Sequence, residues 1–204
     1  PIAKKVKAIN TLKLSNDNKW IGTNTDIDGF IYPLKNLDLR KKSSIILGSG
    51  GAARSVIQGL INLKLSNITI ISRNQNSSNE LITNFKNDIK IKSLLNTDIE
   101  TDDLIQETDL IINTTPVGMN NTKNDDELPF GKGFWDSIKS NTIIYDLIYN
   151  PTPTPLLKFC DKKGCKTIDG TQMLIAQGAK SLSFWTNEIE VPFEVMYDAI
   201  KKYL

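Results

Sequence analysis

Three small residues, Gly48, Gly50 and Ala53, follow a short apolar run and precede a helical pattern. The spacing Gly-x-Gly-x-x-Ala is one form of the dinucleotide-binding fingerprint. In that motif the first glycine makes a tight turn, the second lets a pyrophosphate approach the backbone, and the third small residue allows close packing of helix on strand. The free N–H groups that begin the helix would then face the phosphates. An ordinary tight turn without a ligand is the alternative interpretation.

The elements that must position this motif are also visible in the sequence. Residues 44–47 read as a buried strand, apolar residues recur at helical spacing over residues 52–61, and residues 68–71 read as the next strand. This order of strand, helix and strand is the one that the fingerprint requires. It favours a dinucleotide site over a plain turn.

The tip of the second predicted strand carries Ser72, Arg73 and Asn74, and no acidic residue. Sites for NAD usually place an acidic side chain on the ribose 2′-hydroxyl about 20 residues beyond the glycines. An arginine suits a 2′-phosphate, because its guanidinium brings charge and a planar fork of donors. The sequence therefore favours NADP over NAD, and Arg54 in the same region adds modest support. A solvated surface arginine is the alternative.

Composition excludes several other classes of protein. The chain has 204 residues, a formal net charge of +2 and no long basic run, which argues against a nucleic-acid surface. No apolar stretch approaches the ~20 residues that span a bilayer, and no signal peptide is visible, so we expect a cytoplasmic protein with no membrane partner. The chain has no histidine, and Cys160 and Cys165 are expected to be free thiols. We therefore expect no metal site and no histidine base.

The rest of the chain continues to alternate apolar strands with amphipathic helices. The pattern predicts an α/β fold, a Rossmann-like doubly wound parallel sheet with helices on both faces. Ligands of such sheets bind in the loops after the carboxyl ends of the strands. Further strands are expected at 89–91, 142–149 and 166–170, and another begins at 109 and runs into a loop, broken by proline and glycine, that ends at 119. Helices are expected at 77–87, 103–106, 155–161, 171–186 and 194–203. Residues 120–133 are expected to form a mobile loop.

The first 26 residues do not resemble the start of a domain. Residues 8–12 and 20–23 are predicted as two short strands joined by a turn at 16–18. A lone hairpin of this kind is marginal in water. Thr25 or Asp26 would cap the helix that follows. The lysines near the start are expected to be solvated charges on a frayed terminus.

Six segments, in order over nearly the whole chain, resemble the shikimate dehydrogenase family. Each could occur by chance, but the ordered set is specific. The segments are Ala8–Thr11, Gly22–Gly29, Gly48–Arg54, Asn113–Met119, Tyr145–Pro151 and Asp169–Gln177.

The resemblance implies NADP-linked, reversible reduction of 3-dehydroshikimate to shikimate, a small-molecule substrate. It implies that Asn10 and Asp26 contact substrate hydroxyls, that Asp26 pairs with a lysine as an acid–base dyad, and that Tyr149 and Gln177 complete the substrate site. It also implies a set of cofactor-binding residues. These are Gly48, Ser49, Gly50, Gly51 and Ala52 at the pyrophosphate, Ser72, Arg73 and Asn74 at the 2′-phosphoribose, Leu147 and Gly170 at the nicotinamide, and Thr114.

The sequence departs from the family pattern in two places. The family carries the dyad lysine in an N-V-T-x-P-x-K segment of an N-terminal substrate domain, and this segment does not occur here. Ser77 stands where the family often has a second basic residue. We therefore expect residues 1–26 to be the remnant of a second α/β substrate domain, 27–170 the NADP-binding domain, and 171–204 C-terminal helices packing back toward the substrate domain.

Two alternatives stay open, and the missing lysine motivates the first of them. One is a non-catalytic NADP-binding module, because Asp26 alone would set a negative charge against the charge that develops on the substrate oxygen. The other is a relative that accepts quinate or prefers NAD. The sequence does not indicate the oligomeric state.

Overall fold

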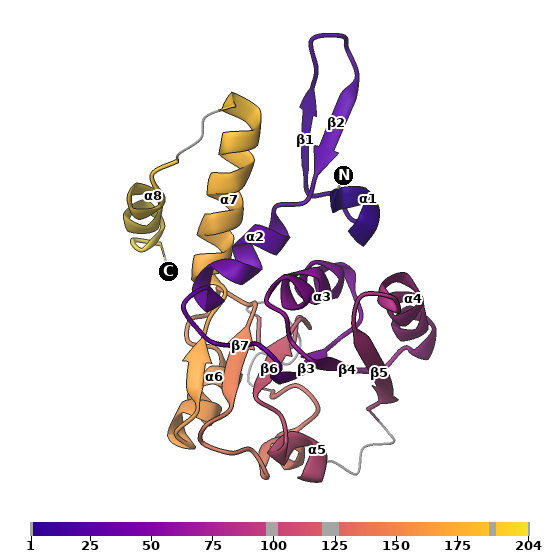
Figure 1. Cartoon of the computed structure of the whole chain (residues 1–204). Coiled ribbons are helices and arrows are strands. Elements are labelled where there is room, and N and C mark those ends of the chain that lie inside the picture. Colours follow the sequence, from indigo (N-terminus) through magenta and orange to yellow (C-terminus); the bar gives the residue numbers. More distant parts are fainter. Residues whose placement is uncertain (1, 97–101, 120–126, 188–190, 204) are drawn as a thin grey trace.

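The computed structural model describes residues 2–96, 102–119, 127–187 and 191–203 (Figure 1). Its strands are β1 (Thr11–Leu14), β2 (Trp20–Thr23), β3 (Ser43–Leu47), β4 (Asn67–Ser72), β5 (Lys90–Leu95), β6 (Leu110–Asn113), β7 (Ile143–Asp146) and β8 (Lys166–Ile168). Its helices are α1 (Ile2–Val6), α2 (Asp26–Ile31), η1 (Tyr32–Leu34), α3 (Gly51–Asn62), α4 (Gln75–Phe85), α5 (Asp102–Gln106), η2 (Lys132–Trp135), α6 (Pro155–Lys162), α7 (Thr171–Thr186) and α8 (Phe193–Ile200).

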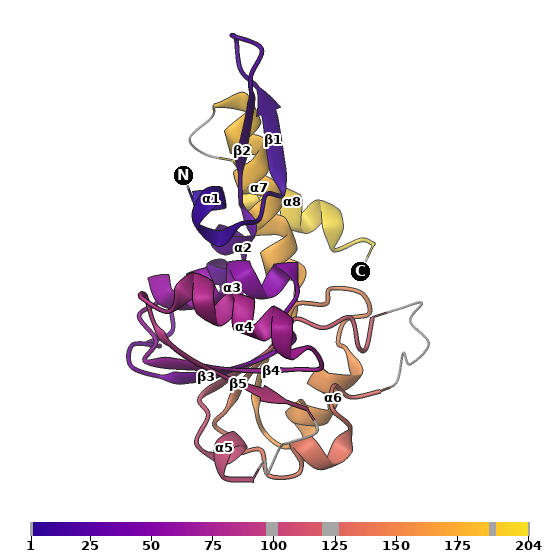
Figure 2. The same cartoon turned by 90° about the vertical axis from the view of Figure 1, so that its right-hand side faces the viewer.

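Six parallel strands form the central sheet, in the order β5-β4-β3-β6-β7-β8. The chain thus winds outward from β3 in one direction and then from β6 in the other, which is the doubly wound order of dinucleotide-binding folds. Figures 1 and 2 show α3 and α4 on one face of the sheet and α5 and α6 on the other. The predicted sheet with helices on both faces is confirmed. Ligands of such folds bind where the order reverses, here between β3 and β6.

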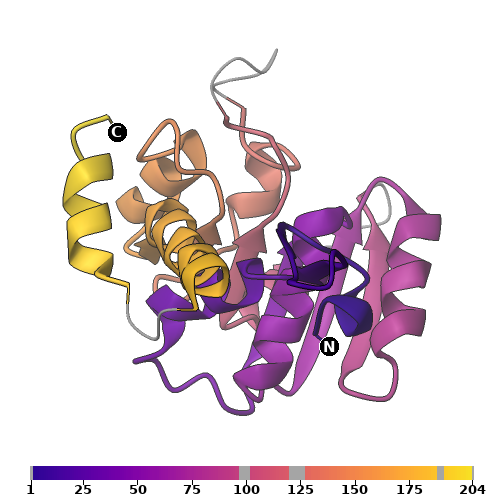
Figure 3. The ribbon, with the colours of Figure 1, turned by 90° about the horizontal axis from the view of Figure 1, so that it is seen from above.

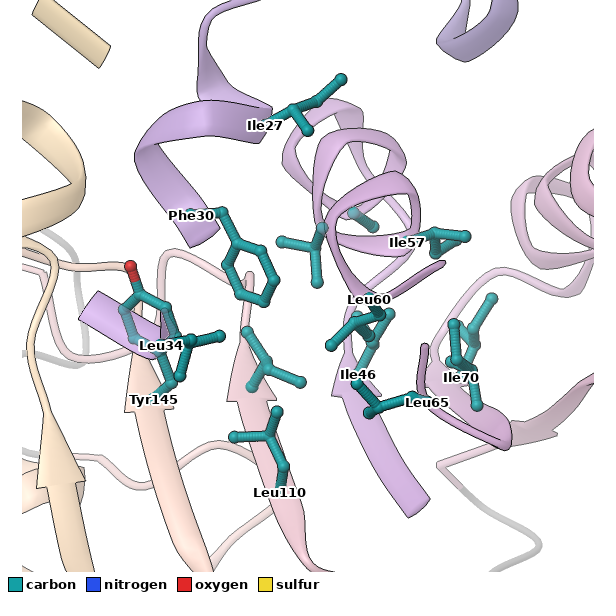
Figure 4. Packing of buried hydrophobic residues seen from close by; sticks show 14 of the residues in the cluster. Ile27, Phe30, Leu34, Ile46, Ile57, Leu60, Leu65, Ile70, Leu110 and Tyr145 are labelled. Atoms are coloured by element: carbon teal, nitrogen blue, oxygen red, sulfur yellow. The ribbon is translucent and has the colours of Figure 1, made fainter. Parts of the chain in front are cut away.

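Each face of the sheet has its own apolar core, because successive side chains of a strand point to opposite faces. Ile46 of β3 joins the core under α2 and α3, whereas Ile45 and Leu47 join the core under α6 and η2. Figure 4 shows the first of these cores, with Phe30 beside Tyr145. Their ring centroids lie 5.2 Å apart and the rings are stacked. This packing fixes α2 on the sheet.

Helix α2 also lies against α7, and Gly29 sets how closely the two approach. A Cβ built on Gly29 would lie 2.7 Å from the carbonyl oxygen of Met173 and 3.0 Å from Cβ of Gln177. Any side chain there would push the helices apart. The small residue therefore brings Gln177 beside the turn of α2 that begins with Asp26.

The hairpin of β1 and β2 forms a two-stranded sheet of its own. It extends beside α7, on the side of the central sheet that α3 and α4 cover (Figures 1 and 2). Its first strand covers residues 11–14 rather than the predicted 8–12. The hairpin is tied to α7, because Nε1 of Trp185 donates to the carbonyl of Leu12 at 2.8 Å and Nζ of Lys13 donates to that of Phe184 at 2.7 Å. These bonds support a hairpin that would be marginal alone.

The expectation of a frayed start was wrong for residues 2–6, which form α1 against α3 (Figure 3). Ala3 and Val6 are buried, and Nζ of Lys5 forms an ion pair with Asp88 at 2.8 Å. The reason is the apolar face of α1, which the sequence pattern alone did not reveal. Of the predicted loop at 120–133, residues 120–126 lie outside the described residues, while 132–135 form η2. No helix in the described ranges is long and apolar enough to cross a membrane.

Candidate active site

The glycine turn has the geometry that a phosphate-binding loop needs. Gly48 lies in the left-handed region at φ 102°, and its N–H donates to the carbonyl of Ile71 at 2.8 Å. A Cβ built on Gly50 or Gly51 would meet no atom within 4 Å. No side chain caps the start of α3, which leaves its first N–H groups available to a ligand. Ala53 is fully buried against the sheet, as the fingerprint predicts.

At the tip of β4, two of the three predicted cofactor contacts use their side chains for local structure. The hydroxyl of Ser72 bonds to that of Ser78 at 2.8 Å, and Asn74 caps α4 by accepting from the N–H of Ser77 at 3.1 Å. Arg73 is exposed and forms no ion pair with any residue that the structure describes. Its guanidinium is therefore the group at this tip that can bind an anion.

Arg54 does not contribute to this tip. Its Nη2 forms a 2.7 Å ion pair with Oε1 of Glu80, on α4. This ion pair accounts for the position of Arg54, so the prediction of a 2′-phosphate site rests on Arg73 alone.

A hollow of about 360 Å³ joins the glycine turn to the tip of β4, at the point where the strand order reverses. Among the residues that the structure describes, no acidic side chain lines it. The lining residues are Gly48, Ser49, Gly50, Ser72, Arg73, Asn74, Asn96, Thr114, Thr115, Pro116, Val117, Pro129 and Phe130. We call it the adenosine hollow. Thr114 lines it, and the hydroxyl of Thr114 donates to the carbonyl of Leu47 at 2.7 Å.

A second hollow of about 410 Å³ lies on the other side of Thr114–Pro116. It is more apolar than polar, and we call it the nicotinamide hollow. Its lining residues are Ala52, Thr114, Thr115, Pro116, Met119, Leu147, Ile148, Tyr149 and Asn150.

The loop after β7 is pinned to the start of α7 at this hollow. The N–H of Gly170 donates to the carbonyl of Ile148 at 3.0 Å. A Cβ built on Gly170 would lie 2.1 Å from the carbonyl oxygen of Leu147, so only glycine fits. The structure thus brings together Leu147 and Gly170, two predicted cofactor contacts that are distant in sequence.

The predicted substrate residues Asn10 and Asp26 are in direct contact. Nδ2 of Asn10 donates to Oδ1 of Asp26 at 2.7 Å, and Oδ1 of Asn10 accepts from the N–H of Thr25 at 2.9 Å. The hydroxyls of Thr11 and Thr25 lie 2.7 Å and 3.0 Å from the hydroxyl of Ser181 on α7. One polar cluster therefore links the hairpin, the start of α2 and α7.

Asp26 occupies the first position of α2, rather than capping it, and is half-buried. Burial raises the pKa of the Asp26 carboxyl, and the hydrogen bond from Asn10 opposes this rise. Among the residues that the structure describes, Asp26 forms no ion pair. Its carboxylate is thus held by a neutral amide, which leaves it able to pair with an ammonium group.

The other two predicted substrate residues reach the site differently. Gln177 is on the α7 turn that packs against Gly29, and its carbonyl accepts from the hydroxyl of Ser181 at 2.9 Å. Tyr149 lies in the nicotinamide hollow, is 44% exposed, and makes no hydrogen bond to the polar cluster in the described part of the chain. The sequence interpretation missed Thr11 and Ser181, because a lone hydroxyl residue carries no spacing signal.

Comparison with known proteins decides the family. The descriptions "Shikimate / quinate 5-dehydrogenase" and "Shikimate 5'-dehydrogenase C-terminal domain" match residues 33–124 and 170–201. A protein of Prochlorococcus marinus subsp. pastoris named shikimate dehydrogenase (NADP(+)) is 81% identical over the whole chain, which spans 72% of its length. The chain belongs to the shikimate dehydrogenase family.

Solved structures of other proteins share the fold described above. A shikimate dehydrogenase in complex with NADP+ has a TM-score of 0.84 and 34% identity, with coverage of 100% of this chain and 69% of that one. The 5-ketofructose reductase of Gluconobacter sp. strain CHM43 has a TM-score of 0.85 at 27% identity, covering 100% and 72%. Because the same fold serves a different substrate in that relative, substrate must be argued from the site.

Described residues contain no group of three or more side chains that could hold a metal ion. The predicted substrate residues offer the carboxylate of Asp26, the amides of Asn10 and Gln177, and the hydroxyl of Tyr149.

Proposed function

We propose that this chain serves the NADP-dependent, reversible reduction of 3-dehydroshikimate to shikimate. The observation that carries the cofactor assignment is the adenosine hollow, where the open glycine turn and Arg73 line one space and no described lining residue carries a carboxylate. A 2′-phosphate would be repelled by an acidic side chain at this tip and attracted by a guanidinium.

The two hollows give a dinucleotide one site for each of its halves. The pyrophosphate would meet the first N–H groups of α3 at Gly50 and Gly51, and the 2′-phosphate would meet Arg73. Leu147, Gly170 and the apolar wall of the nicotinamide hollow would hold the nicotinamide ring. When bound, the cofactor supplies the hydride.

On the substrate side, this chain's residues bind and orient hydroxyl groups. The Asn10 amide and the Asp26 carboxylate present a donor and acceptors at one spot, which suits a polyhydroxylated ring. Asp26 would hold and tune the ammonium that protonates the developing alkoxide, since a positioned proton donor accelerates such a step by about 10²–10⁴. Tyr149 and Gln177 would contact the substrate from the loop after β7 and from α7.

The first experiment is calorimetric titration of this chain with NADP and with NAD. We expect tight binding of NADP and weaker binding of NAD. NAD carries a hydroxyl in place of the 2′-phosphate that Arg73 would bind. Equal affinity for the two dinucleotides would contradict the NADP assignment. Binding of neither would contradict the dinucleotide site itself.

The second experiment tests the substrate. The chain is joined to the part of the Prochlorococcus relative that lies outside the matched region, and NADPH formation is followed with shikimate and with quinate. We expect turnover with shikimate. Turnover with quinate alone would favour the quinate-accepting alternative, and tight NADP binding without any turnover would favour the non-catalytic module. A cytoplasmic location stays a prediction.

A further inference from the structure

Asp146 is a fully buried carboxylate at the carboxyl end of β7, paired in the sheet with Asn113 at the end of β6. Its Oδ1 accepts from Nδ2 of Asn113 at 2.9 Å and from the N–H of Ile148 at 3.2 Å. Its Oδ2 accepts from the hydroxyl of Thr154 at 2.8 Å. Asp146 forms no ion pair with a described residue. Three neutral donors from three segments therefore converge on one buried charge.

Each donor belongs to a segment that the carboxylate holds in place. Oδ1 of Asn113 accepts from the N–H of Thr115 at 3.0 Å and from its hydroxyl at 2.7 Å, which fixes the start of the loop after β6. The bond to the N–H of Ile148 fixes the loop after β7. Thr154 caps α6 by accepting from the N–H of Leu157 at 3.2 Å. Asp146 thus links two loops and a helix start.

The two loops held in this way both line the nicotinamide hollow. Thr115 and Pro116 come from the first loop, and Ile148 and Tyr149 come from the second. Asp146 itself does not line the hollow, so it acts on a ligand only through these loops. The adenosine hollow depends less on this network, because the glycine turn and the tip of β4 form much of its wall and receive no bond from Asp146.

Stability alone does not account for a charge at this position. An unpaired buried carboxylate destabilises a fold, and burial raises the pKa of Asp146 to about 6. A carboxylate is, however, the short side chain that accepts from several converging donors at once. We propose that Asp146 is a positioning residue that fixes the two loops of the nicotinamide hollow in their binding geometry. This inference rests on the proposed function, which assigns that hollow to the nicotinamide half of NADP.

The test compares two ligands on the whole chain by calorimetry. NADP occupies both hollows, and adenosine 2′,5′-bisphosphate carries only the adenosine half. For Asp146→Ala we expect the affinity for NADP to fall at least about tenfold, because the lost hydrogen bonds to the carboxylate order the two loops of the nicotinamide hollow. The affinity for the bisphosphate should fall by less than about threefold. Asp146→Asn keeps the shape and one acceptor oxygen, which can take the two hydrogen bonds from Asn113 and Ile148, so it should restore most of the NADP affinity.

Asp109→Ala is the matched control. Asp109 is an aspartate beside the amino end of β6, where it accepts from the N–H of Ser43 at 2.9 Å and pairs with Lys42. This variant removes a carboxylate from the opposite end of the strands of the same sheet. We expect it to lower thermal stability while leaving the affinity for both ligands unchanged.

The ratio of the two affinities decides the proposal. Equal losses for NADP and the bisphosphate in Asp146→Ala, or no loss for either, would overturn the positioning role. If Asp146→Ala does not fold, Asn113→Ala removes the same link from the other strand and must show the same preferential loss of NADP affinity. A wild-type chain that binds neither ligand would overturn the proposed function, and with it the assignment of this hollow.

Discussion

The side-chain amide of Asn10 donates a 2.7 Å hydrogen bond to the carboxylate of Asp26, and this bond joins the two ends of a hairpin. Asn10 precedes β1, and Asp26 begins α2 after β2. The hairpin therefore closes on itself at its base and delivers both groups to one point beside α7. The bond also favours the ionised carboxylate against the effect of burial.

We predict that Asn10→Ala raises the pKa of Asp26, because the change removes the donor that opposes burial. In the shikimate assay of the joined protein, kcat/KM should fall about 10- to 100-fold, the range expected for a hydrogen bond to a charged group. The acidic limb of the pH profile should move to higher pH. Asn16→Ala, at the exposed turn of the hairpin, is the control and should leave the profile unchanged. An unshifted profile in Asn10→Ala would show that the amide does not tune Asp26.

We predict that Gly29→Ala destabilises the fold by about 1–3 kcal/mol, because its Cβ would lie 2.7 Å from the carbonyl oxygen of Met173. Backbone atoms cannot move aside as a flexible side chain can. Gly133→Ala is the matched control, since a Cβ there meets no atom within 4 Å. Urea unfolding of both variants measures the difference. Equal free energies of unfolding would mean that α2 and α7 separate without penalty.

We predict that Arg73→Ala weakens NADP binding about 10- to 100-fold, as expected for loss of a charge-assisted contact to phosphate. Binding of NAD should change by less than about threefold, because NAD has no 2′-phosphate. Arg40→Ala is the control, since Arg40 is exposed and pairs with Asp38 at 2.9 Å. Calorimetry of the wild type and both variants with each dinucleotide gives the six affinities. A parallel loss of NAD and NADP would place Arg73 outside the 2′-phosphate site.

We predict that Asp146 makes stability depend on pH in the acid range. Burial raises its pKa from 3.8 to about 6 in the folded chain, so between these values the folded state binds more protons than the unfolded state. The free energy of unfolding should therefore fall as pH rises from about 4 to about 6, by about 3 kcal/mol from this group, and stay level above.

The comparison of wild type with Asp146→Asn isolates this contribution, because asparagine does not titrate. Urea unfolding at several pH values gives the difference between the two proteins. The wild type should lose stability relative to the variant as pH rises to about 6. A difference that stays constant from pH 4 to pH 7 would refute the raised pKa.

We predict that Cys160 resists alkylation in the native state. The thiol is fully buried, and burial raises its pKa to about 12, so little thiolate forms near neutral pH. Cys165 is also buried, and burial raises its pKa too. Iodoacetamide at pH 8 should label both cysteines only after urea unfolds the chain. Rapid labelling of Cys160 without urea would show that α6 opens readily.

Local sequence patterns were sufficient for most of the fold. Apolar runs of strand length, helical spacing and turn residues are set by neighbours in the chain, so they predicted the strands and helices of the sheet. Misplacements occurred where tertiary contact intervenes. The first strand of the hairpin begins later than predicted, and residues 2–6 dock on α3.

The sequence by itself determined the glycine turn at Gly48, the absence of an acid at the tip of β4, and hence the preference for NADP. It did not determine that Ser72 and Asn74 use their side chains within that tip. It also gave no sign that Ser181 joins the cluster at Asp26, or that Asp146 links two loops of the site. Those relationships join residues that are distant along the chain. They exist only because tertiary packing, for example the contact of Gly29 in α2 with α7, fixes how the elements meet.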